Sequence, residues 1–403
     1  MHEVPRLLLD LALVLGVAAV ITVGCQRLRI PVIMGYLVAG LVVGPHVPIP
    51  LVADERNVAT LAELGVIFLM FCIGLEFSPR AFLKAAPIAG LVGGLEVGAL
   101  AAAGYGLGLL LGWPPLTCLF AGGITAISST MIIAKAFAER PVSERLRRFV
   151  LSVLIVEDLC AVLLLTLLTA AATLGGLQAG HVGGLLLKLL AFIAAVLLLG
   201  QWAVPALFRW LGRQGKEELM AVSAVGFCFT LAVLAAQAGF SLAMGAFLAG
   251  MLVSESGEGK HLEHLLMPFR DVFAAIFFVS VGMQLDPRLL PGLWLPILAF
   301  ALLVALGKIV AVTLASAAAR IPPRTGIEAG MALAQIGEFS FIIAATGLAH
   351  GAVKPELFAV AVGTSILTSL ATPTLLGLGP VAGARVEARL PAAWRRRWAL
   401  RKD

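Results

Sequence analysis

The chain has 403 residues, of which 60% are hydrophobic and 13% are charged, with a formal net charge of +6. A soluble domain has roughly 25% charged residues, so this composition excludes an ordinary soluble protein. Apolar runs long enough to cross a bilayer, about 17 to 25 residues, recur along almost the whole chain. The composition therefore predicts an all-α polytopic membrane protein and leaves no stretch for a soluble domain.

We predict about thirteen transmembrane helices from these runs. They lie near residues 7–24, 31–45, 59–77, 86–111, 116–137, 149–173, 183–211, 219–238, 241–254, 268–285, 293–319, 326–349 and 356–378. Most of the 29 Lys and Arg residues fall in alternate connections, and such residues gather on the cytoplasmic side of a membrane. We therefore expect a multi-pass protein with its N-terminus outside and its C-terminus in the cytoplasm.

Two short motifs occur twice, each time seven predicted helices apart. The segment GYLVAGLVV (Gly35–Val43) matches GAFLAGMLV (Gly245–Val253), and GLEFSPR (Gly74–Arg80) matches GMQLDPR (Gly282–Arg288) at nearly the same offset. An odd separation means that the two copies enter the membrane from opposite sides. Such inverted repeats are typical of secondary transporters. The alternative is that helices rich in small residues resemble one another because small residues allow close helix packing.

The repeat divides the chain. We predict a transmembrane domain over residues 1–383, with a first repeat at about 7–173, a linker helix at about 183–211 and a second repeat at about 219–378. Residues 384–403 form a basic tail with which we expect the chain to contact the anionic inner leaflet.

Polar residues interrupt two of the predicted helices at matching positions of the repeats. The segments are GGITAISSTMI (Gly122–Ile132) and ALAQIGEFSFI (Ala332–Ile342). Gly, Ser and Thr allow a helix to unwind in mid-membrane where the freed backbone groups find other partners. We predict two broken, crossing helices here. The alternative is two intact helices whose Ser and Thr hydroxyls bond to their own backbone.

Two adjacent acids, Glu157 and Asp158, lie in the otherwise apolar run SVLIVEDLCAVLLLTLL. A charge at the centre of a membrane helix costs about 2.5 to 3.5 kcal/mol, so neither acid is expected to face lipid. Lys308, in ALLVALGKIVAVTL, is the plausible buried partner. A permanent salt bridge would be purely structural. A carboxylate that binds a cation and a proton in turn is, however, what proton-coupled transport needs, and buried ionisable groups in membranes are functional by default.

A longer set of motifs carries a family resemblance. In chain order these are PVIMGYLVAGLVVGP, LGVIFLMFCIGLEFSP, ITAISST, VEDL, GFSLAMGAFLAGMLVSES, FFVSVGMQLDP, GK and ALAQIGEFSF. Together they resemble the Kef-like monovalent cation/proton antiporters, in the second family of cation:proton antiporters. The resemblance implies an NhaA-like fold with a moving six-helix core domain and a dimerisation domain. It also implies that Asp158 is the essential aspartate, while Glu157 stands where relatives have Asp or Gln.

On this resemblance we expect K+ or Na+ to bind at Asp158 and to compete there with protons. Lys308 is expected to compensate the charge of an acid, and Glu157 to be a second proton carrier or a fixed acid. Further candidate site residues share a polar side chain in or beside the interrupted helices or in a facing span. For the cation site these are Thr125, Ser128, Ser129 and Thr130, and in a second tier Glu338, Gln335 and Glu96.

The expected partners are K+ or Na+, protons, the lipid bilayer, a second copy of the chain and a cytoplasmic regulatory domain or subunit beyond residue 403. We expect no cofactor, no enzymatic activity and no nucleic acid, because the basic residues follow the predicted topology. Two alternatives stay open. One is a cation channel or ligand-gated K+ efflux protein of the same fold. The other is an intramembrane aspartyl hydrolase using Asp158 with Glu338, for which no further signature is present.

Overall fold

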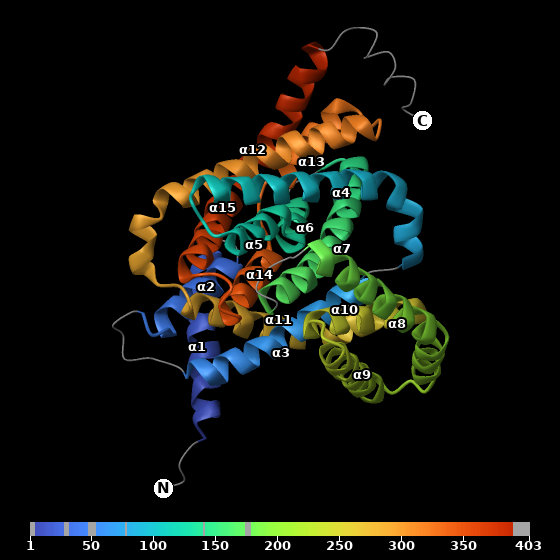
Figure 1. The fold of residues 1–403 in the computed structure, drawn as a ribbon. Helices are drawn as coiled ribbons and strands as arrows, with labels where there is room; N and C mark the ends of the chain where they lie inside the picture. Colours follow the sequence, from blue (N-terminus) through green and yellow to red (C-terminus); the bar gives the residue numbers. More distant parts are fainter. Residues whose placement is uncertain are drawn as a thin grey trace. The chain divides into compact units, whose positions relative to one another are not determined.

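The structure, a computed structural model, describes residues 5–27, 32–46, 54–76, 79–139, 142–173 and 179–389, and nearly all of them are helical (Figure 1). The predicted all-α class is confirmed. The helices are α1 (Arg6–Arg27), α2 (Val32–Val43), α3 (Glu55–Glu76), α4 (Pro79–Leu110), α5 (Pro115–Ala126), α6 (Thr130–Glu139), α7 (Glu144–Thr173), α8 (Ala179–Arg213), α9 (Glu217–Gln237), α10 (Leu242–Val253), α11 (Gly259–Met283), α12 (Trp294–Ala318), α13 (Pro323–Ala332), α14 (Glu338–Ala349) and α15 (Pro355–Arg389), with a π-helical turn η1 (Ser254–Glu258) and a 3₁₀ segment η2 (Pro287–Gly292).

Each of the thirteen predicted ranges coincides with one helix or with a pair of helices. Among the described residues, nine helical stretches are long and apolar enough to cross a membrane, or ten if the bent pair α13 and α14 is one span. One of the nine, Leu242–Met283, joins two predicted spans, and α2 and α5 are short apolar helices. The chain is therefore a multi-pass membrane protein, while the number thirteen stays a prediction.

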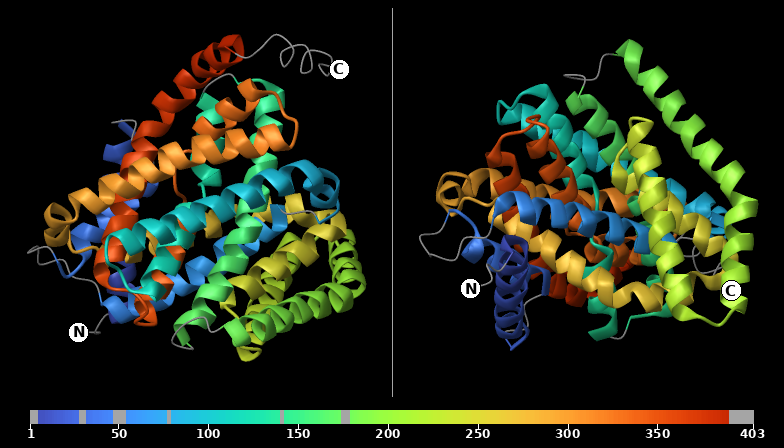
Figure 2. Two further views of the ribbon diagram at one scale, coloured as in Figure 1. Left: turned by 45° about the horizontal axis from the view of Figure 1, so that its top comes forward. Right: turned by 90° about the horizontal axis from the view of Figure 1, so that it is seen from below.

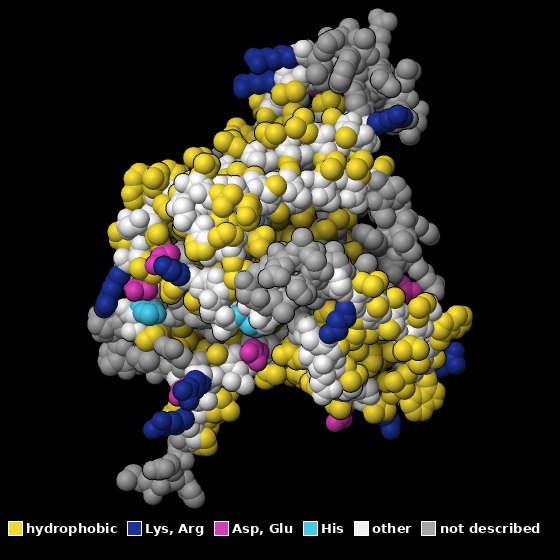
Figure 3. All heavy atoms as spheres, in the orientation of Figure 1, with side chains coloured by type: hydrophobic (Ala, Val, Ile, Leu, Met, Phe, Trp, Pro, Cys, Tyr) yellow, Lys and Arg dark blue, Asp and Glu magenta, His cyan; other side chains and the backbone are white. Residues whose placement is uncertain are grey.

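Large apolar side chains lie on the surface, as expected where lipid is the solvent. Hydrophobic side chains spread over much of the face drawn in Figure 3. On α8, for example, Leu199 is 79% and Trp202 77% exposed. Exposed apolar area of this extent marks a membrane or protein contact.

Residues 390–403, which hold most of the predicted basic tail, lie outside the described residues, and α15 extends through the start of that tail to Arg389.

The chain forms two compact units, and each takes segments from both predicted repeats. The first unit comprises residues 1–81 and 165–287, and the second comprises 82–164 and 288–403. Helices α4 and α7 therefore contribute to both units. This exchange of segments agrees with an inverted repeat, whose domain boundaries remain a prediction.

In the first unit, glycines bring helix backbones into contact at two crossings. A Cβ atom on Gly40 of α2 would overlap the Val279 carbonyl oxygen of α11, and one on Gly250 of α10 would overlap the Phe71 carbonyl oxygen of α3. Gly282 lies at the first crossing and Gly74 at the second. The repeat pairs Gly40 with Gly250 and Gly74 with Gly282, so the two crossings are equivalent. The matching motifs thus serve matching contacts, and α3 and α11 run side by side in Figure 2.

The second unit contains the two interrupted helices. Helix α5 begins at Pro115, a favoured first residue because proline lacks an N–H that would otherwise be unpaired, and it ends at Ala126. Ile127 is extended, and α6 begins three residues later at Thr130. Helix α13 also begins with a proline, Pro323, and α14 follows it with a bend of 47°. Both interruptions lie where the repeated polar segments predict them.

Candidate ion-binding site

The two interruptions in the second unit are bonded to each other through their backbones. The Gly337 N–H donates to the Ile127 carbonyl oxygen at 3.1 Å. The Ser128 hydroxyl donates to the Leu333 carbonyl oxygen at 3.0 Å. A Cβ atom on Gly337 would lie only 2.6 Å from the Ser128 carbonyl oxygen, so a glycine is required for this approach. The unwound groups of one helix therefore satisfy those of the other, as buried backbone demands.

The Gln335 side chain completes this junction. Its Oε1 accepts from the Ser129 N–H at 2.9 Å, and its Nε2 donates to the Ser129 carbonyl oxygen at 3.2 Å. The Ser129 hydroxyl donates to Glu338 Oε2 at 2.8 Å, and Glu338 is the first residue of α14, where the helix dipole favours a negative charge. Gln335 thus holds the backbone of Ser129, and Glu338 its hydroxyl, from the opposite interruption.

Lys308 of α12 reaches the end of α5 at the first interruption. Its Nζ lies 2.8 Å from Glu96 Oε1, 2.7 Å from the Ser128 hydroxyl oxygen, 3.0 Å from the Ala126 carbonyl oxygen and 3.3 Å from Glu157 Oε2. An ammonium has three N–H groups, so four acceptors compete for them. The side chains of Lys308, Glu96 and Glu157 are fully buried. The ammonium also lies at a helix C-terminus, where the dipole favours a positive charge.

The two adjacent acids of α7 have different surroundings. Glu157 is fully buried, and its Oε2 accepts from the Ser128 N–H as well as from Lys308. Asp158 is 7% exposed, and its Oδ2 accepts from the Thr130 hydroxyl at 3.1 Å. Adjacent helical residues point about 100° apart, which explains the difference. Glu157 thus belongs to the Lys308 cluster, while Asp158 lies beside the first turn of α6.

The predicted residues are not all brought together. Thr125 lies in the last turn of α5, and its hydroxyl is within 3.1 Å of the carbonyl oxygens of Leu100, Ala121 and Gly122. That hydroxyl is engaged with α4 and its own helix. Glu96, placed in the second tier from the sequence, is in contact with Lys308. Ser340, which sequence analysis did not single out, donates to the Ile124 carbonyl oxygen at 2.7 Å and ties α14 to α5.

Carboxylate and hydroxyl oxygens dominate this site, and these are ligands that hard cations prefer. Among the described residues, Glu96 Oε2 and Glu157 Oε1 are buried without a hydrogen-bond partner. No group of three or more His, Cys, Asp or Glu in the described part of the chain is suited to hold a metal ion.

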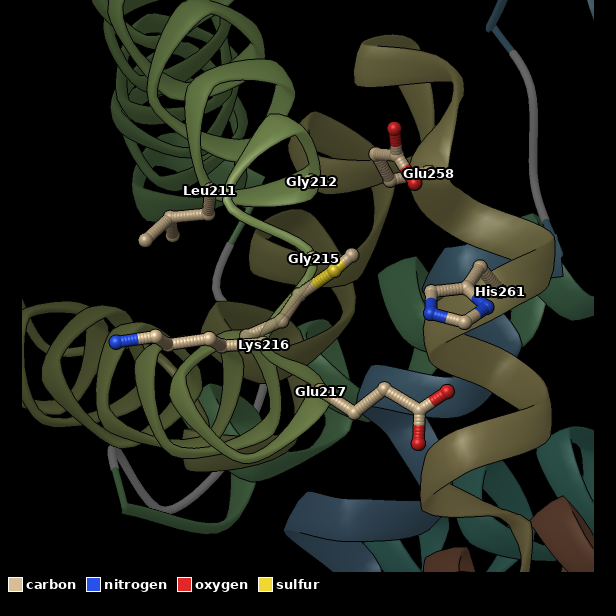
Figure 4. A pocket seen from close by; sticks show the side chains of 8 residues that line it. Leu211, Gly212, Gly215, Lys216, Glu217, Glu258 and His261 are labelled. Atoms are coloured by element: carbon tan, nitrogen blue, oxygen red, sulfur yellow. The ribbon is translucent and has the colours of Figure 1, made fainter.

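A separate cavity of about 320 Å³ lies in the first unit, where α8 ends and α9 begins. In Figure 4, Glu217, Glu258 and His261 border this cavity, whereas the Lys216 side chain points away from it. None of the predicted site residues lines it, so it is distinct from the acid cluster of the second unit.

Comparison with known proteins identifies the family. The model of the family described as "Sodium/hydrogen exchanger, transmembrane" matches residues 12–378. The putative cation/proton antiporter YbaL of Escherichia coli is 36% identical over 383 residues, covering 92% of this chain and 67% of YbaL. The K(+) efflux antiporter 5 of Arabidopsis thaliana is 31% identical, covering 94% of this chain and 67% of that protein.

The glutathione-regulated potassium-efflux system protein KefC of Enterobacter sp. is 32% identical, covering 92% of this chain and 60% of KefC. Among solved structures, the sodium proton antiporter MjNhaP1 from Methanocaldococcus jannaschii has the same fold, with a TM-score of 0.71 at 15% identity over 94% of this chain and 99% of that one. The predicted resemblance is thus confirmed at the level of both sequence and fold. The chain belongs to the transmembrane sodium/hydrogen exchanger family.

Proposed function

We infer that the chain is a secondary active antiporter that exchanges a monovalent cation for protons by alternating access. The observation that carries this inference is the buried Glu157–Asp158 pair beside two interrupted helices, with Lys308 between Glu157 and Glu96. Intramembrane acids at broken helices are where transporters of this architecture bind coupling ions. The relatives named as K(+) efflux antiporters favour K+, and the fold neighbour named as a sodium proton antiporter keeps Na+ as the alternative.

Asp158 is the residue at which cation and proton compete in this proposal. It is the less buried of the two adjacent acids, and Thr130 already supplies a hydroxyl oxygen to the same place. We assign Asp158 and the Thr130 hydroxyl to the cation. Ser128 and Ser129 hold the junction between the interruptions, and Thr125 supports α5, so these three belong to the framework of the site. Binding a proton at Asp158 removes the charge that attracts the cation, which couples the two fluxes.

The remaining expectations are part of the same proposal. The core domain moves the site across the membrane against a dimerisation domain, in a homodimer. The chain lies in the cytoplasmic membrane with its N-terminus outside. The family consists of exchangers, which supports a transporter without a cofactor. A regulatory domain or subunit would act on the cytoplasmic side.

The test is a pH-gradient assay in proteoliposomes with K+, Na+ or Li+ added in turn. Wild-type protein is expected to move protons when a cation is added, and Asp158→Asn is expected to abolish this movement, because the amide has no charge to exchange. Glu144→Gln is the matched control on the same helix, since Glu144 forms an exposed pair with Arg148 at 3.4 Å. Full activity of Asp158→Asn would remove the proposed site. Cation flux without proton movement would favour a channel.

A further inference from the structure

Glu96 of α4 is a buried acid that the exchange at Asp158 does not use. Its side chain is fully buried, and its Oε1 lies 2.8 Å from Lys308 Nζ. That distance is shorter than the 3.3 Å between Lys308 and Glu157. Lys308 is therefore held more closely by Glu96 than by the acid next to Asp158.

The charges of this cluster do not balance if every group is ionised. One ammonium faces two carboxylates, and all three side chains are fully buried. An uncompensated buried charge is strongly destabilising, whereas a buried pair is tolerated. The Cys160 thiol on α7 also lies near Glu96 and Glu157. It supplies no positive charge, so the balance calls for one proton.

Two acid oxygens without hydrogen-bond partners also indicate that one of the two acids carries a proton. Glu96 Oε2 and Glu157 Oε1 are both buried without a partner among the described residues. A carboxylate accepts hydrogen bonds only, so two ionised acids cannot satisfy each other. A protonated acid has an O–H to donate, and this would remove part of the cost of an unpaired buried group.

The surroundings favour Glu96 as the protonated acid. Glu157 Oε2 accepts from both the Ser128 N–H and Lys308. Among the described residues, Glu96 Oε1 accepts from Lys308 alone. Hydrogen bonds to the charged form of an acid favour that form. The backbone donor of the interrupted helix thus keeps the charge on Glu157 and leaves the proton to Glu96.

We propose that Glu96 is a second proton-carrying residue of the transport cycle, which releases its proton when the cation binds and regains it when the cation leaves. The proposal rests on the proposed antiport function. A cation at Asp158 adds positive charge beside Glu157, and Lys308 connects that place to Glu96 through the contacts above. Asp158 has by then already given up its own proton, so the cation adds one positive charge to the site, and loss of the Glu96 proton offsets that charge. The chain then moves one more proton per cation than Asp158 alone would exchange, so that transport carries net charge.

The first experiment uses infrared difference spectroscopy of purified protein, recorded without a cation and then with K+ or Na+. The wild type is expected to show the carbonyl stretch of a protonated carboxylic acid. This band should weaken when the cation is added, and it should be smaller in Glu96→Gln. In Asp158→Asn, the part of this band that is due to Glu96 should remain. A spectrum in which Glu96→Gln leaves this band unchanged would overturn the proposal, even if no transport is measured. If Glu96→Gln cannot be purified, Glu96→Asp is measured instead. Its band should lie at a different frequency from that of the wild type.

The second experiment measures current and cation flux together in proteoliposomes. Gln resembles a protonated Glu and cannot release a proton, so Glu96→Gln is expected to keep cation flux while the current per transported cation falls to near zero. A merely structural role would lower flux and current in proportion. An unchanged ratio of current to flux would contradict the proposal. If the wild type shows no cation-dependent proton movement at all, the antiport function is refuted instead. The infrared band does not depend on transport, so it tests Glu96 separately.

Discussion

Lys308 has an environment that differs from what its neighbours in sequence suggest. It lies in an apolar helix, yet its ammonium contacts Glu96, Glu157 and the unwound end of α5. A buried ion pair is weak evidence for stability, because the desolvation of its charges offsets their attraction. Removing one partner is a different matter, since it leaves charge buried without compensation.

Lys308→Met tests how much stability is lost when the buried acids have no cation beside them. The change leaves Glu96 and Glu157 facing each other without a cation, and the expected loss of stability is about 3–5 kcal/mol. A thermal melt of the purified protein should show a clearly lower transition temperature. Lys188→Met on the exposed face of α8 is the control, because Lys188 is exposed and its ammonium lies over the Phe240 ring at 5.6 Å. Equal melting temperatures for the two variants would contradict the central role of Lys308.

At the scale of the elements, the fold depends on close approach of helix backbones. The crossings of α2 with α11 and of α3 with α10 both occur at glycines related by the repeat. In a membrane, where apolar side chains gain nothing by leaving lipid, small residues that allow van der Waals packing stabilise such crossings. The repeated motifs are therefore constrained by packing at the same places where they resemble each other.

Gly250→Ala should disrupt the crossing of α3 and α10. The added methyl group would overlap the Phe71 carbonyl oxygen, which is backbone and cannot turn away. We expect a large loss of folded protein, measured as the monodisperse fraction in size-exclusion chromatography. Gly226→Ala on α9 is the matched control, since its Cβ would meet nothing within 4 Å. A normal yield of Gly250→Ala would show that the helices are farther apart than described.

At the scale of the whole molecule, the charge distribution predicts on which side each connection lies. The broken span of α13 and α14 offers a direct test, because exposed residues flank both of its ends. Arg320 precedes α13 on the side that the positive residues assign to the cytoplasm, and His350 follows α14 on the other side.

A membrane-impermeant thiol reagent added outside intact cells should label His350→Cys and leave Arg320→Cys unlabelled. In inside-out vesicles the result should be reversed. The unmodified chain, with its five cysteines, measures the background. Labelling of both variants from the same side would contradict the predicted topology, because an odd number of crossings must separate the two positions.

The sequence by itself determined the class, the family and the place of the acids. Apolar runs reveal spans because the bilayer sets their length, and the repeat is visible because both copies keep the same glycines. Glu157, Asp158 and Lys308 stand out because a charge in lipid is costly wherever its helix points.

Only the tertiary structure decided which acids Lys308 contacts and where the hydroxyls point. Glu96 and Lys308 are 212 residues apart in the chain, and their contact depends on which faces of α4 and α12 meet. The same holds for Thr125, whose hydroxyl turns to the Leu100 carbonyl, and for Ser340, which reaches Ile124. The direction of a side chain around its helix is set by packing against other helices, and apolar runs that are hydrophobic on all sides carry no signal for it.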